Sequence, residues 1–119
     1  MTTEGQNFTI YQGDSKEVII SVTNEDGSVT DLAGYAGAVF VAYNQTLDSI
    51  VIQKLLADGI TIPTPSNGQL VITLDSEDTE DLVPKNYGIQ CEIEDAFGNH
   101  ATVMTGYMKV LRSITHSLL

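Results

Sequence analysis

The segment QLVITLDSEDTEDLVPKNYGIQCEIED, residues 69–95, decides the fold that the sequence predicts. Its last part places an apolar residue at every second position, and these residues are Tyr87, Ile89, Cys91 and Ile93. Such alternation is typical of a strand with one buried and one solvated face. Residues 69–74 form a second predicted strand, and the acidic link between the two contains one predicted turn of helix that ends before Pro84. The segment therefore predicts a crossing between two strands.

The same alternation recurs along the rest of the chain in short stretches that turn signals separate. We expect strands at residues 7–12, 16–23, 36–43, 50–56, 60–62 and 100–111. The periodicity of residues 50–56 also allows a helix, and their Ile-Val-Ile start favours a strand. Residues 36–43 are apolar on both faces, as in a central strand, and Gly106 suggests a bulge in the last strand. Leu32 is expected to plug the edge of the core. The ends, residues 1–6 and 112–119, are expected to be flexible.

This pattern of about seven or eight short strands predicts an all-β fold, either an antiparallel β-sandwich or a small barrel, in one domain over residues 1–119. We favour an immunoglobulin-like sandwich because Tyr87 stands at the start of a strand, where a tyrosine hydroxyl can bond back to the preceding corner. Leu82 is expected to anchor the helical turn, and Cys91 to fill the core as a small apolar side chain. These three residues are the predicted structural residues.

Composition restricts the partners of the protein. The chain of 119 residues carries five basic and sixteen acidic residues, for a net charge of −11. Such a charge opposes binding to nucleic acid or to an anionic membrane surface. The single cysteine excludes an intrachain disulfide. The N-terminal residues lack the charged and apolar regions of a signal peptide, and no apolar run is long enough to span a bilayer.

No pattern of catalytic residues is evident in the sequence. His100 and His116 have no recognisable partner, and phosphate-binding, metal-binding and nucleophile motifs are missing. We therefore predict no enzyme activity and no cofactor. Calcium is the one metal to weigh, and its candidate ligands are Asn24, Glu25, Asp26, Asp75, Glu77, Asp78, Glu80 and Asp81, which turn and capping chemistry explains. Tyr11, Tyr35 and Tyr43 are candidate stacking platforms for a carbohydrate.

The order of several short motifs resembles the N-terminal domain of phage baseplate upper proteins and related small tail proteins. The matching segments are FTIYQGD (8–14), VIISV (18–22), NEDG (24–27), TDLAG (30–34), the apolar strand ending at Tyr43, DGI (58–60), NGQLVI (67–72), YGIQCEI (87–93), DAFG (95–98) and GYMKV (106–110). The resemblance implies an immunoglobulin-like domain that docks into a virion and carries no catalytic residues. The sequence ends without the helical and receptor-proximal regions that usually follow, so tail, baseplate, head fibre and capsid surface remain open.

The resemblance leads to the functional hypothesis of a non-enzymatic structural protein in a tailed-phage virion. Its expected partners are other virion proteins and further copies of itself. Candidate contact residues are the apolar ones opposite the inward-facing set, namely Ile19, Phe40, Val41 and Val71. The alternatives are a capsid decoration or head-fibre protein, and a module that binds a glycan or receptor on the host surface. A calcium-stabilised adhesion domain is a further alternative.

Overall fold

In the computed structural model, which describes residues 4–115 and 118, the alternating segments form strands. These are β1 (Glu4–Tyr11), β2 (Lys16–Ser21), β3 (Gly37–Asn44), β4 (Ser49–Leu56), β5 (Gly59–Thr61), β6 (Gln69–Leu74), β7 (Asn86–Glu94) and β8 (His100–Leu111). A single helical turn, α1 (Ser76–Thr79), follows β6, and a 3-10 turn, η1 (Pro65–Asn67), precedes it. The predicted all-β fold is confirmed, and residues 50–56, which allowed either strand or helix, are a strand.

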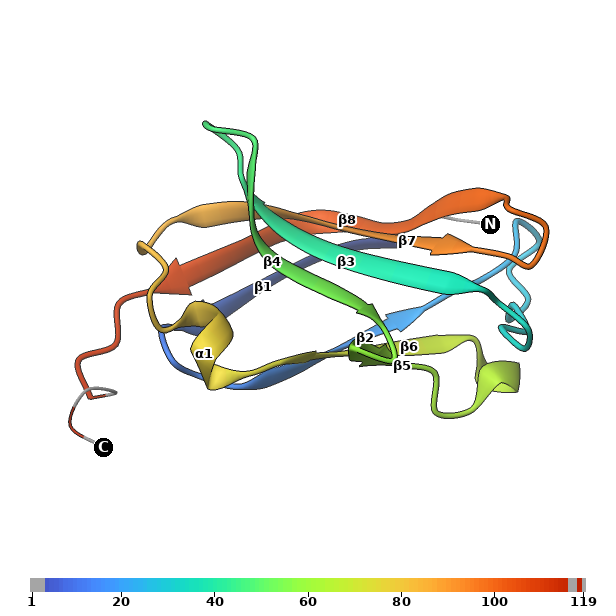
Figure 1. The fold of residues 1–119 in the computed structure, drawn as a ribbon, viewed down its shortest axis with the longest axis horizontal. Helices are drawn as coiled ribbons and strands as arrows, with labels where there is room; N and C mark the ends of the chain where they lie inside the picture. Colours follow the sequence, from blue (N-terminus) through green and yellow to red (C-terminus); the bar gives the residue numbers. More distant parts are fainter. Residues whose placement is uncertain (1–3, 116–117, 119) are drawn as a thin grey trace.

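The described strands join edge to edge in the order β1-β8-β7-β3-β4-β5-β6-β2, and this sheet folds over to give two layers. Figure 1 shows β1, β8, β7 and β3 in one layer and β2, β5 and β6 in the other, with β4 running obliquely towards the second layer. The neighbours β3, β7 and β8 correspond to strands C, F and G of an immunoglobulin-like sandwich, and β2 and β6 to strands B and E.

Two of the strand pairings differ from the antiparallel sandwich that the sequence predicts. β1 runs parallel to β8, from Glu4 beside Met104 to Tyr11 beside Leu111, and the short β5 runs parallel to β4. β1 also starts at Glu4 rather than at Asn7, so the expectation that residues 1–6 are flexible is wrong for residues 4–6. The first residues of β1 are polar and do not show the alternation of a strand. They form a strand because they pair with β8.

The core lies between the layers and is built from the inward residues of the strands. Phe40, Ile20 and Leu70 are among its fully buried side chains, and Leu32 closes one edge as expected. β3 is a central strand, between β4 and β7. Burial of such side chains contributes about 1.5–3 kcal/mol each, which makes this core the main source of stability.

The last strand contains a bulge, although not at Gly106. Cys91 of β7 faces Met104, and Glu92 faces Thr102, so Val103 is the extra residue. Val103 and Met104 are both buried, and the alternation of inward and outward residues changes phase at this point. Glycine is required at position 106 for another reason, because a Cβ there would overlap the carbonyl oxygen of Gln6 in β1. The glycine lets β1 lie against β8.

The described residues beyond β8, 112–115 and 118, add no strand to the sheet. His116, one of the two histidines weighed as catalytic candidates, lies outside the described residues, as do residues 1–3, 117 and 119.

Candidate functional site: the outer face of β3, β7 and β8

The predicted structural residues hold the corner between the two layers. The hydroxyl of Tyr87 donates a hydrogen bond of 2.7 Å to the carbonyl oxygen of Val83, and the ring is buried. Burial raises the pKa of this phenol, while the hydrogen bond to Val83 opposes the rise. Leu82 is half-buried and packs against the core. Tyr87 thus makes the tyrosine corner that the sequence predicts.

Cys91 is buried in the core, as expected. Burial, with the charge of Glu92 as a second cause, raises the pKa of its thiol to about 12. The thiol is therefore protonated at neutral pH and cannot serve as a nucleophile, because the thiolate is the reactive form.

Three of the four candidate contact residues lie on the outer faces of the two layers, and the fourth is buried. Ile19 of β2 is 50% exposed and sits directly opposite Val71 of β6 on the outside of that layer. Val41 of β3 is half-buried on the outside of the other layer. Phe40 has no exposed surface at all, so its selection as a contact residue is wrong. Because the residues on both faces of β3 are apolar, the sequence of this strand does not indicate which face is buried.

The outer face of β3, β7 and β8 carries a row of residues that the strand register places side by side. The row runs from β4 to β1 through Ile50, Tyr43, Gly88, Tyr107 and Asn7. The Tyr43 ring lies over Gly88, since a Cβ at Gly88 would overlap the Cζ, Cε2 and Oη atoms of that ring. Tyr107 is 50% exposed, and its backbone N–H donates a 2.9 Å hydrogen bond to Oδ1 of Asn7.

A hollow of about 180 Å³ lies between the two tyrosines of this row. Its wall is formed by Tyr43, Gln45, Ile89, Thr105, Gly106 and Tyr107. Of the three tyrosines that the sequence offers as stacking platforms, Tyr43 alone belongs to this hollow, because Tyr11 ends β1 and Tyr35 precedes β3. Tyr107, its partner across Gly88, was missed, although the residues of the last strand alternate and mark it as outward-facing.

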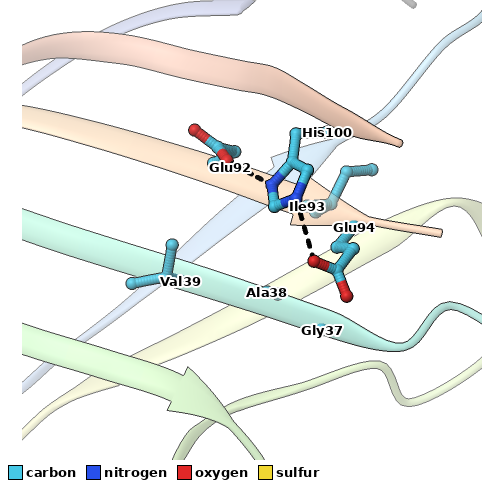
Figure 2. Close-up of a pocket in the computed structure, with 7 residues that line it drawn as sticks. All are labelled: Gly37, Ala38, Val39, Glu92, Ile93, Glu94 and His100. Carbon is cyan, nitrogen blue, oxygen red and sulfur yellow. Dashed lines mark hydrogen bonds and ion pairs between the residues drawn. The ribbon is translucent and has the colours of Figure 1, made fainter. Parts of the chain in front are cut away.

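The other end of the same face holds a cluster of charged side chains around His100 (Figure 2). Nδ1 of His100 lies 2.7 Å from Oε1 of Glu92, and Nε2 lies 2.9 Å from Oε2 of Glu94. A neutral imidazole has one N–H donor, so both contacts are hydrogen bonds when the ring is protonated. The expectation that His100 has no partner is wrong, because the hairpin register sets His100 opposite Glu94 and close to Glu92, which faces Thr102.

This charged cluster borders a shallow hollow of about 170 Å³. Figure 2 shows His100 between the two glutamates, above the part of β3 that contains Gly37. The cluster brings together an acid–base group and carboxylates without a hydroxyl or thiol nucleophile among the residues that line the hollow. Among the described residues no group of three or more histidine, cysteine, aspartate or glutamate side chains is placed to hold a metal ion.

The turn between β7 and β8 exposes Phe97, whose side chain is 90% accessible. Asp95 holds this turn: Oδ1 accepts from the backbone N–H of Phe97 at 2.8 Å and of Asn99 at 3.0 Å, and Oδ2 accepts from the Asn99 side chain at 3.0 Å. These hydrogen bonds, above all those from Asn99, keep the pKa of Asp95 below its ordinary value. An ordered turn thus presents an aromatic ring to solvent, a feature that the sequence pattern predicts as a turn alone.

The acidic segments weighed as calcium ligands make turn and capping contacts. Asp26 accepts from the backbone N–H and the hydroxyl of Ser28, and these bonds lower its pKa. Asp75 and Asp78 form a reciprocal capping box at α1, and Asp78 also lies 2.8 Å from Nζ of Lys54. The local geometry agrees with the capping explanation.

Comparisons with known proteins place few limits on the function. No family model and no curated protein matches the chain. CopC from Methylosinus trichosporium OB3b is similar in structure at 12% sequence identity and a TM-score of 0.41, over 78% of this chain and 94% of that chain. Within the described residues, no helix has the length and apolar character to cross a membrane. The described structure therefore establishes an all-β sandwich. A function can be proposed from its exposed features.

Proposed function

We propose that this chain is a non-enzymatic structural protein of a tailed-phage particle, where it acts through protein–protein contacts. The observation that carries the contact role is Phe97, an aromatic side chain held almost fully in solvent by an ordered turn. Aromatic side chains at the centre of an interface supply much of its binding energy, and a turn that is already ordered loses little entropy on binding. The assignment to a phage rests on the ordered resemblance of the sequence motifs.

A second exposed apolar site supports the same role from the opposite end of β3. The turn between β3 and β4 stands clear of both layers in Figure 1 and carries Leu47, which is 72% exposed, and Ile50, near the start of β4, is 57% exposed. Oδ1 of Asn44 accepts from the backbone N–H of Thr46 at 3.0 Å and from Nζ of Lys85 at 3.2 Å, so the base of this turn is also fixed. Apolar contacts at both ends suit a protein that connects two neighbours.

The faces that carry Ile19, Val71 and Val41 are secondary contact surfaces in this proposal. Ile19 and Val71 form a directly opposed apolar pair, and Val41 lies between Gln53 and Gln90. Contacts with further copies of the chain would place these faces at symmetric interfaces. A place on the capsid, as a decoration or head-fibre protein, would use the same side chains.

The test is incorporation of the tagged chain into purified particles of the phage whose genome encodes it. Particles from a density gradient should contain its peptides by mass spectrometry, and antibody labelling in electron micrographs should place it on tail, baseplate or head. Phe97→Ser should reduce incorporation about tenfold or more, because loss of a central aromatic contact costs ~2 kcal/mol or more.

The matched control is Ile114→Ser, which removes an apolar side chain that is 79% exposed and lies outside both proposed contact turns. Both variants should keep the melting temperature of the parent chain, because neither side chain is part of the core. Particles that lack the chain would refute the phage assignment. Incorporation of Phe97→Ser at the parent level would refute the role of the β7–β8 turn.

A further inference from the structure

The row of Tyr43, Gly88 and Tyr107 has a feature that assembly contacts do not require. Its hollow is walled by aromatic, amide and hydroxyl groups and contains no charged residue, although the chain has a net charge of −11. Gln45 and Thr105 stand at its edges, beside the two rings. An uncharged wall on so acidic a protein favours a neutral polar ligand over an ion.

The position of the Tyr43 ring has a structural explanation, whereas the exposure of the Tyr107 ring has none. The Tyr43 ring covers Gly88, and an aromatic ring over a strand glycine compensates for the missing side chain. Tyr107 covers no glycine in this way and leaves half of its surface in solvent. The strand register places Tyr107 on the other side of Gly88 from Tyr43, because Gly88 of β7 pairs with Tyr43 of β3 and with Tyr107 of β8.

Tyr107 also borders a second hollow on the side away from Tyr43. This hollow measures about 280 Å³, and its wall is formed by Asn7, Phe8, Thr9, Asn86, Tyr107 and Lys109. The Oδ1 atom of Asn7 accepts a hydrogen bond from the backbone N–H of Tyr107, which holds the Asn7 side chain beside Tyr107. Side-chain amides and hydroxyls therefore flank the Tyr107 ring in both hollows, and Lys109 is the one charged residue in the wall of the second.

We propose that Tyr107 and Tyr43 form a binding site for a neutral saccharide. A pyranose has an apolar face of C–H groups and an edge of hydroxyls. The C–H face would stack on the exposed Tyr107 ring, and the hydroxyls would meet Gln45 and Thr105 in one hollow and Asn7 and Asn86 in the other.

The size of the two hollows limits the ligand to a short saccharide. Each is smaller than the ~300–1,000 Å³ that holds a drug-sized ligand, so one sugar unit per hollow is the natural occupancy. The sites are open and shallow, and we expect a single sugar to bind with a Kd on the order of 1 mM. A disaccharide that spans Tyr107 should bind more tightly than either of its units.

The experiment is a nuclear magnetic resonance titration of the ¹⁵N-labelled full chain with glucose, galactose, N-acetylglucosamine, maltose and lactose as probes. At least one sugar should shift the backbone amides of Gly88, Gly106 and Tyr107 in a saturable manner. Tyr107→Ala should weaken that binding about tenfold, and Tyr107→Phe, which keeps the ring, should retain most of it.

Tyr11→Ala is the matched control, because Tyr11 is also 50% exposed but borders a hollow with the charged residues Asp14 and Arg112. It should bind the sugar as the parent chain does. Phe97→Ser should bind it equally well, which separates this site from the proposed assembly contact. No shift with any probe, or equal binding by Tyr107→Ala, would overturn the proposal.

Discussion

Tyr87 combines a buried ring with a hydroxyl that reaches back to the carbonyl oxygen of Val83. The ring is part of the core, and the hydrogen bond fixes the corner through which the chain passes from α1 into β7. These two contributions can be separated by experiment, because phenylalanine keeps the ring and removes the hydrogen bond.

Tyr87→Phe is expected to lower the free energy of unfolding by about 1 kcal/mol, the usual contribution of one intramolecular hydrogen bond. Urea denaturation of parent and variant at neutral pH measures the difference. Tyr107→Phe is the control, because that hydroxyl belongs to a half-exposed side chain and its loss should change stability by less than about 0.5 kcal/mol. Equal effects of the two substitutions would contradict a special role for the corner.

The same residue gives the stability a defined dependence on alkaline pH. Because burial raises the pKa of the Tyr87 phenol, the unfolded chain ionises at lower pH than the folded chain. The contribution is therefore complete below the ordinary tyrosine pKa of about 10 and is lost as pH rises through the folded pKa. The parent chain should lose stability above that pH more steeply than Tyr87→Phe does.

The pairing of β1 with β8 depends on close approach of two backbones at Gly106. A Cβ at that position would meet the carbonyl oxygen of Gln6, and backbone atoms cannot move aside as a flexible side chain can. Gly5, in the neighbouring strand, has no atom within 4 Å of the corresponding position and offers a matched site for comparison.

Gly106→Ala is expected to destabilise the protein by about 1–3 kcal/mol, as overpacking does, and to loosen β1. Hydrogen exchange should become faster at the amides of β1, while the amides of β3 keep their protection. Gly5→Ala should change the stability by less than about 0.5 kcal/mol. Protection of β1 at the parent level in Gly106→Ala would show that the pairing of β1 with β8 tolerates a Cβ at this position.

Most of the strands could be predicted because a strand with one buried face has an apolar residue at every second position. β6 and β8 begin and end where the alternation predicts, and the Tyr87 corner follows from a tyrosine placed before an alternating strand. The start of β1 was not predictable, because the polar residues there become a strand by pairing with β8.

The candidate sites were less predictable because they depend on register between strands. The cluster of His100 with two glutamates depends on the hairpin register, which sets His100 opposite Glu94 and Thr102 opposite Glu92. Tyr43 and Tyr107 meet across Gly88 through two separate pairings, so neither tyrosine indicates the other by its position in the sequence. Phe40 was assigned to the surface because β3 is apolar on both faces.

The net charge of −11 acts on the protein as a whole. Few cations offset it locally, and the ion pairs to the exposed Asp75 and at His100 involve partly solvated groups, whose pairs contribute little. Mutual repulsion of the carboxylates should therefore oppose folding at low ionic strength.

The melting temperature is expected to rise when NaCl is increased from about 10 mM to about 1 M, because the Debye length then shortens from ~30 Å to ~3 Å. Differential scanning calorimetry at neutral pH measures the change. The rise should shrink as pH falls towards the isoelectric point of about 4.1, where the net charge disappears. A melting temperature that does not respond to salt at neutral pH would contradict net repulsion.

The parallel contact between β1 and β8 joins the first and the last described strands of the chain at one edge of the sheet. The backbone N–H of Tyr107 and the side chain of Asn7 are bonded across 100 residues of sequence. During synthesis β1 leaves the ribosome long before its partner strand β8 has been made. The ladder of β1 therefore stays unpaired until β8 has emerged, and contacts of such long range slow the folding of β-proteins. A ribosome-bound chain that stops before β8 should present β1 as an open edge to chaperones or to other nascent chains.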